Sequence, residues 1–345
     1  MTVTYHSGRR IQGTQVDFDG ISAVSGGWKE VGRTTASGGG TDVTVSSLSD
    51  KRYYMILSSW TMSTSAQSRW RFNNDTGSNY TGRYSSDGGT DATATSQSSI
   101  PYNNPGFDLT PHWNVGYIAN KSDKEKLWIN NQIYQNTAGA GTAPGRQEQT
   151  CKWANTSDVI NEIRLNSSAG TYDSGSELVV LGWDPNDTHT DNFWEELDDS
   201  SWSSGSSWTS GTFTAKKYLW VQFYTEGGAG SSYFRFNGDS GNNYANRYSI
   251  NGGSDSTIAS QPESYLGAID GLSFHNLFII NNASNEKLFT HQRVSRSTAG
   301  AGTAPTRNEG AGKWSNTSNQ ITSITVTTAG GGNFTAGNMK VWGSN

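Results

Sequence analysis

The chain has 345 residues, of which 32% are hydrophobic and 12% are aromatic, with 41 glycines and a net charge of −5. The aromatic content argues against disorder, and the spread of 25 basic and 30 acidic residues leaves no basic patch for nucleic acid. No apolar run approaches the roughly 18 residues that a membrane-spanning helix needs, so no membrane partner is expected.

The first 25 residues have no counterpart elsewhere in the chain, and we predict that residues 1–25 form an extended N-terminal arm. Within it, VTYHSGRRIQG can act as a strand that anchors the subunit to a neighbour through Tyr5, Arg9, Arg10 and Ile11, or it can be frayed. The arm carries no apolar signal segment. We therefore expect synthesis in the cytoplasm without a signal peptide.

The first repeat begins near Trp28, and strands are predicted at 41–46 and 52–60, where β-branched and aromatic residues are dense. Residues 71–97 follow, with three short stretches separated by Asp-, Asn- and Gly-rich turns, a pattern typical of a three-stranded meander. This stretch returns at 235–261 with 16 of 27 residues identical. The recurrence indicates a duplicated domain.

A second duplicated stretch supports this interpretation. Residues 137–163, which begin TAGAGTAP, return at 298–324 with 17 of 27 residues identical. Strands are also predicted at 114–120, at EKLW and at 178–183, where the first repeat ends. The polar stretch 184–191 is predicted to be the linker.

In the second repeat, strands are predicted at 209–214, 217–225, 276–282 and 339–343, and no helical period occurs. The sequence therefore predicts an all-β protein of two tandem, homologous antiparallel β-sandwich domains of the jelly-roll or lectin-like kind, at 26–183 and 192–345. We expect about eight to ten strands in each domain. Each is expected to fold independently around a core of large rings.

The duplicated stretches, the terminal LVVLG and the N-terminal YHSGRRIQG together resemble a family of Gly/Ser/Thr-rich repeat proteins from marine tailed viruses of bacteria and archaea. The resemblance covers nearly the whole chain. Members of this family occur as virion surface proteins, so the resemblance implies a location on a virus particle more than a chemistry.

One candidate ligand site lies in the duplicated stretch 71–97. Arginines and a carboxylate beside tyrosine faces suit glycan recognition, because they combine planar hydrogen bonding with an apolar platform. The alternative is that the same side chains hold the strands together, with the aspartate capping a turn. The candidates are Arg71, Asp75, Tyr80, Arg83 and Tyr84, with their counterparts Arg235, Asp239, Tyr244, Arg247 and Tyr248.

Other chemistries are disfavoured by the sequence. Asp75 with Asn79, and Asp239 with Asn243, could offer oxygens to Ca²⁺, but an Asx turn is preferred because a calcium site needs more carboxylates. TAGAGTAP lacks the G-K-[ST] of a phosphate loop. The five histidines do not share repeat positions, and Cys151 is replaced by glycine in the second repeat. We therefore expect no metal, no cofactor and no enzymatic activity.

The first functional hypothesis is a virion structural protein, either a capsid, a capsid-decoration or a tail-fibre component. It would self-associate through its sandwich modules and contact other virion proteins. A trimer would present six similar modules and suit a threefold axis. The alternative is a lectin-like adhesin that binds host glycans through exposed aromatic faces.

Overall fold

The computed structural model describes residues 27–101, 109–185, 187, 189, 191–227, 230–269, 271–296 and 298–345. These residues form 23 β-strands and no helix, which confirms the all-β prediction. No helix in this part of the chain could span a membrane. The predicted arm, including Tyr5, Arg9, Arg10 and Ile11, lies outside the described residues.

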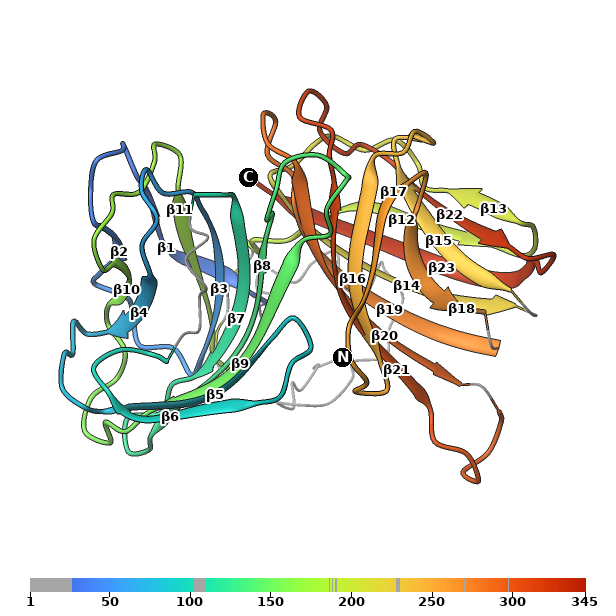
Figure 1. Cartoon of the computed structure of the whole chain (residues 1–345). Helices are drawn as coiled ribbons and strands as arrows, with labels where there is room; N and C mark the ends of the chain where they lie inside the picture. Colours follow the sequence, from blue (N-terminus) through green and yellow to red (C-terminus); the bar gives the residue numbers. More distant parts are fainter. Residues whose placement is uncertain are drawn as a thin grey trace, which may run out of the picture.

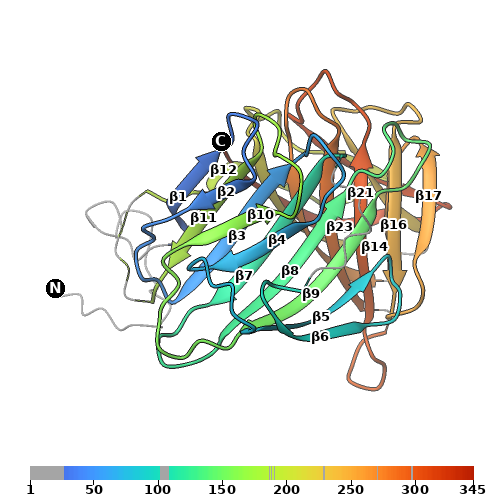
Figure 2. The same cartoon turned by 60° about the vertical axis from the view of Figure 1, so that its left-hand side comes forward.

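The first repeat is a sandwich of one large and one small antiparallel sheet (Figure 1). In spatial order the large sheet contains β1 (Lys29–Thr35), β11 (Glu177–Trp183), β3 (Tyr53–Trp60), β7 (His112–Ala119), β8 (Lys126–Tyr134), β9 (Gly145–Trp153), β5 (Tyr80–Ser86) and β6 (Ala92–Gln97). The small sheet contains β2 (Asp42–Val45), β10 (Ile163–Ser167) and β4 (Ser68–Phe72). Figure 2 shows these three strands lying in front of the large sheet.

The second repeat has the same strand order, with one additional strand in its small sheet. Its large sheet contains β12 (Glu195–Trp202), β23 (Phe334–Ser344), β14 (Tyr218–Gly227), β19 (Gly271–Ile280), β20 (Lys287–Arg296), β21 (Thr306–Trp314), β16 (Tyr244–Ile250) and β17 (Ser256–Gln261). Its small sheet contains β13 (Ser207–Thr209), β22 (Ile324–Ala329), β15 (Ser231–Phe236) and β18 (Ser264–Ala268). The tandem β-sandwich prediction is therefore confirmed, with more strands than the expected number.

The duplicated stretch 71–97 is not a meander, and that prediction was wrong. Strand β4 pairs with β10 in the small sheet, whereas β5 pairs with β6 and β9 in the large sheet. The turn between β4 and β5 therefore carries the chain from one layer to the other. Only the β5–β6 turn is a hairpin, with Asp87 and Gly88 both at positive φ, as a type I′ turn requires.

The strand predicted at 209–214 is also displaced, because β13 ends at Thr209. Beyond it, Ser210 and Phe213 keep single backbone hydrogen bonds to Ile324 and Thr322. The Phe213 side chain is buried in the second core. Phe213 therefore packs into the core although the chain around it is not a strand. Its place in the alternating sequence pattern is what led to the strand prediction.

Large rings fill the space between the two sheets of each repeat. In the first repeat, Trp70 meets Trp128 edge to face with ring centroids 5.3 Å apart. In the second, Phe236 packs against Phe289 at 5.7 Å and Trp314 at 5.7 Å. Such aromatic pairs add stabilisation beyond the area they bury.

Candidate functional site: the interface between the repeats

The outer faces of the two large sheets pack on each other and bury a third hydrophobic core (Figure 1). Trp113 of β7 stacks on Tyr218 of β14 at a centroid distance of 5.7 Å. Its indole N–H also donates to the carbonyl of Phe278, 3.2 Å away. The repeats therefore share a core, which the sequence pattern did not predict.

A buried carboxylate lies at one edge of this shared core. Glu177 of the first repeat accepts hydrogen bonds from Lys217 at 2.6 Å, from Tyr218 and from Thr35 at 2.7 Å. Burial alone would raise the pKa of Glu177, but these hydrogen bonds outweigh it and lower the pKa to about 2. The carboxylate is thus ionised and holds two residues of the second repeat.

Residues 137–144, TAGAGTAP, form a loop that docks on the second repeat, and we call it the docked loop. The backbone N–H of Ser260 donates to the carbonyl of Ala140 at 2.7 Å, and Arg247 donates to the carbonyl of Pro144 at 2.9 Å. Ala140, Ala143 and Pro144 are buried.

The start of the docked loop covers an ion pair of the second repeat. Lys313 donates to the carbonyls of Gln135 at 3.1 Å and Thr137 at 2.5 Å, while Glu286 accepts from the N–H of Gly139. Burial lowers the pKa of Lys313, and the neighbouring carboxylate of Glu286 partly offsets this. Lys313 and Glu286 lie 3.7 Å apart, and both are almost completely buried.

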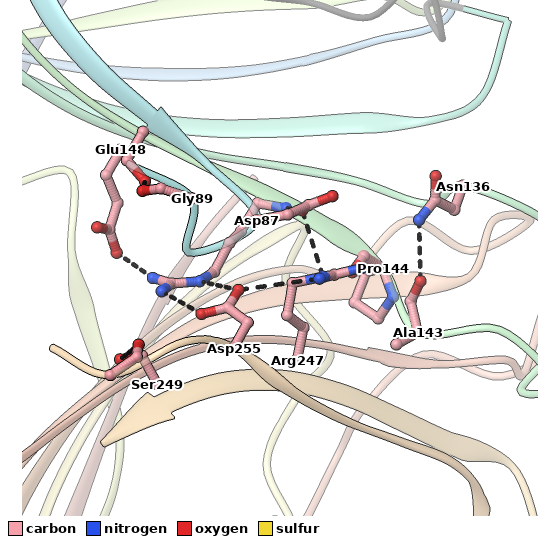
Figure 3. Close-up of polar contacts among 12 residues, drawn as sticks. Asp87, Gly89, Asn136, Ala143, Pro144, Glu148, Arg247, Ser249 and Asp255 are labelled. Atoms are coloured by element: carbon pink, nitrogen blue, oxygen red, sulfur yellow. Dashed lines mark hydrogen bonds and ion pairs between the residues drawn. The ribbon is translucent and has the colours of Figure 1, made fainter. Parts of the chain in front are cut away.

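A charged cluster beside the docked loop completes the junction (Figure 3). Arg146 binds Asp255 through two hydrogen bonds of 2.9 and 2.7 Å, and the side chains are only 7% and 2% exposed. Arg247 forms an ion pair with Asp87 at 3.2 Å. Bidentate pairing of this kind fixes orientation as well as adding energy.

Most of the residues that were predicted to bind a ligand have structural roles. Tyr80 is buried, and its hydroxyl contacts both the N–H and the carbonyl of Phe72. Asp75 accepts from the N–H of Gly77 at 2.7 Å, as an Asx turn requires, and from the indole of Trp153 at 2.7 Å. Tyr244 and Asp239 repeat these contacts in the second sandwich, the latter with Trp314.

The predicted arginines are not gathered at one site. Arg71 donates to the carbonyl of Ser98, whereas Arg235 pairs with Glu263 at 2.5 Å. Arg247 belongs to the interface between the repeats, and Tyr248 packs against Tyr265 at 4.8 Å. None of these four predicted residues lines the cavity that holds Arg83 and Tyr84, which are the first-repeat counterparts of Arg247 and Tyr248.

Four cavities along the junction are lined by residues of both repeats, and two of them are relevant to ligand binding. The cavity that holds Arg83 and Tyr84 measures about 330 Å³, and Glu148 also lines it. A larger groove of about 510 Å³ lies where Tyr117 of the first repeat meets the outer face of the second large sheet. Aromatic and amide side chains line this groove, including Tyr117, Trp220, Phe274, Gln222, Asn276 and Gln292.

The remaining predictions concern metals and reactive groups. Within the described residues, no group of three or more His, Cys, Asp or Glu side chains is placed to hold a metal ion. His275 and His291 lie in contact at 3.2 Å inside the second sandwich, a pairing that their sequence positions did not indicate. Burial raises the pKa of Cys151 to about 12, so its thiol is kept protonated.

Comparisons with known proteins do not assign the chain to a family. No family model matches it, and no curated protein matches it. Domains LG4-5 of the mouse laminin alpha1 chain align over 87% of this chain and 83% of that chain, with 12% identity and a TM-score of 0.21. The mavirus major capsid protein aligns over 99% and 93%, with 8% identity and a TM-score of 0.15. Scores this low carry no functional argument.

Proposed function

We propose that the chain is a structural subunit of a virion surface layer, which self-associates through the outer faces of its large sheets. The main support comes from comparing three exposed apolar side chains with their counterparts in the other repeat. Leu127 of β8 is 56% exposed, whereas its counterpart Leu288 of β20 is buried in the shared core. The first repeat thus presents an apolar side chain where the second repeat makes an interface.

The second repeat shows the reverse situation. Trp113 and Ile133 lie opposite each other on β7 and β8 and are buried in the shared core. Their counterparts Phe274 and Val294, also opposite each other, are 45% and 44% exposed. Exposed apolar patches of this kind mark interaction surfaces. Each repeat therefore leaves exposed the copies of apolar side chains that the other repeat buries at the interface.

Sedimentation velocity of the purified full-length chain tests this proposal. The distribution should shift from monomer toward larger species as protein concentration rises, and negative-stain electron microscopy should show rings, sheets or filaments. Antibodies raised against the chain should label the surface of intact particles. A chain that stays monomeric at every concentration and is absent from particles would contradict the proposal.

The groove on the second large sheet supports a second candidate function, the binding of a host glycan. Trp220 and Phe274 offer ring faces to a sugar, and Gln222 and Asn276 offer planar hydrogen-bonding groups beside them. The smaller cavity adds Arg83 and Tyr84.

A glycan array separates these possibilities. If the smaller cavity binds sugar, Arg83→Ala and Tyr84→Ala abolish binding; if the groove binds it, Trp220→Ala does so. Asp173→Ala, in a different cavity, serves as the control and should leave binding unchanged. An array without any bound glycan would remove this candidate.

A further inference from the structure

The docked loop has an identical copy in the second repeat that touches nothing comparable. Residues 298–305 are again TAGAGTAP, and all eight are exposed. We call them the free loop. Exposed loops tolerate substitution because little contacts them. Complete identity between a docked loop and an exposed one is therefore not explained by the isolated chain.

The free loop already has the shape of the docked loop. The pattern of bends and turns is the same at every position of 137–144 and 298–305. Gly139 and Gly300 both have left-handed backbone, with φ of +84° and +89°. Little ordering would be needed for the free loop to bind, and this favours affinity.

The surface that receives the docked loop also has a copy, in the first repeat. Each of its contact residues is identical there, and each copy is solvent-accessible. Ser96 corresponds to Ser260, Arg83 to Arg247, Glu125 to Glu286, and Lys152 to Lys313. Ser96 and Ser260 also share a positive φ of 54° and 51°, so the local backbone bulge is the same. We call this copy the acceptor surface.

The two residues of the buried ion pair also have equivalents, which are not paired with each other. Arg307 corresponds to Arg146, and Asp91 corresponds to Asp255. Arg307 and Asp91 are 58% and 52% exposed, and each forms an ion pair within its own repeat, with Glu309 and Arg83 respectively. These two side chains are the charges that the Arg146–Asp255 pair would require in a second copy of the interface.

Residues that are repeated because they stabilise the fold have the same environment in both repeats. Lys126 and Lys287 are both buried, and each donates to two loop carbonyls of its own repeat. Both lysines therefore have the same structural role. In contrast, the docked and free loops are identical in sequence but differ in environment, and so do the two surfaces. The needs of the fold alone therefore do not explain why these residues are repeated.

We propose that the free loop of one chain docks on the acceptor surface of a second copy and reproduces the junction between the repeats. This inference rests on the proposed function and names its interface. A twofold relation between the repeats would have docked both loops within one chain. Because one loop and one acceptor surface remain exposed, the contact is head-to-tail and generates rings or filaments.

The test uses full-length chains with one face disabled. Ala301 corresponds to the buried Ala140, so Ala301→Arg should block the free loop. Ala299 corresponds to Ala138, which stays exposed even in the docked loop, so Ala299→Arg is the matched control. Asp91→Arg should disable the acceptor surface by placing like charges opposite Arg307.

Sedimentation velocity should show Ala301→Arg and Asp91→Arg each associating roughly 30-fold or more weakly than the wild type. Ala299→Arg should associate normally. Mixing Ala301→Arg with Asp91→Arg should give a 1:1 dimer that grows no further, because one intact loop meets one intact acceptor surface. Unchanged circular dichroism and melting temperature would show that each variant is folded.

The outcomes separate the inference from the proposed function. If the wild type associates and Ala301→Arg associates equally well, the head-to-tail interface is wrong while the structural role stands. If the two variants fail to form a dimer together, the contact is not head-to-tail. A wild type that remains monomeric overturns both.

Discussion

At the scale of single residues, a buried carboxylate such as Glu177 can make the contact between the repeats depend on pH. Its pKa is lowered from 4.5 to about 2 in the folded chain. A lowered pKa contributes stability that is present above the unfolded-state pKa and is lost as the pH falls toward the folded value. The Glu177 contribution should therefore disappear between about pH 4.5 and pH 2.

Glu177→Gln tests this expectation, since glutamine resembles the protonated carboxyl group. Urea unfolding should show the variant less stable than the wild type near pH 7, with the difference shrinking as the pH is lowered through this window. A difference that stays constant with pH would mean that the charge of Glu177 is not what stabilises the junction.

The buried histidines add a second pH effect of the same sign. Burial lowers the pKa of His291 from 6.5 to about 3 and of His112 to about 4. Because the unfolded chain takes up these protons at higher pH, stability should begin to fall below about pH 6.5. His112→Gln should flatten the wild-type curve in this range, as measured by the urea midpoint at successive pH values.

At the scale of elements, the β5–β6 turn determines how closely the repeats approach. Gly88 has a φ of +68°, and a Cβ at this position would overlap the carboxylate of Asp255. Its counterpart Gly252, with φ of +74°, would place a Cβ 3.0 Å from the flexible end of Arg307. Both substitutions share the strain of a left-handed residue, which is about 1 kcal/mol.

Gly88→Ala should therefore destabilise the chain more than Gly252→Ala, because only the former disturbs the Arg146–Asp255 pair. Thermal unfolding at concentrations below self-association measures the difference. Equal losses in the two variants would show that backbone strain alone accounts for the effect.

The duplicated stretches illustrate what the sequence could and could not predict at this scale. Strand positions followed from alternating aromatic and β-branched residues, as in β4 and β14. The Asx turn at Asp75 followed from the low number of carboxylates, which disfavoured a calcium site. The meander failed because a turn that changes layers has the same Asp, Gly and Asn composition as a hairpin turn. The sheet to which a strand belongs is decided by its pairing with strands that are distant in the sequence. The local residue pattern carries no information on that pairing.

The interface between the repeats was hidden for a related reason. TAGAGTAP is identical in both repeats, so nothing in its residues distinguishes a docked loop from an exposed one. The identity of all eight residues was the available signal. It points to an interface only once the structure shows that one copy is docked and the other is exposed. Glu177 offered no repeated signal, since its counterpart is Asn338, whose side chain binds Asp199, Ser200 and Ser201 of its own repeat.

At the scale of the whole molecule, the shared core couples the stability of the two sandwiches. Separating the repeats would expose Trp113, Tyr218 and Leu288 together with the ionised Glu177. The chain should therefore unfold in a single calorimetric transition, with equal calorimetric and van't Hoff enthalpies. Two resolved transitions would show instead that the repeats unfold independently, as the sequence alone suggested.

The short connection between β11 and β12 has a consequence for when chains meet. The contact between the two halves of one chain forms at a high effective concentration that is independent of how many chains are present. The equivalent contact between chains obeys mass action. Newly made chains would therefore stay apart while dilute and join only where they accumulate, so that growth is confined to the place where subunits are gathered.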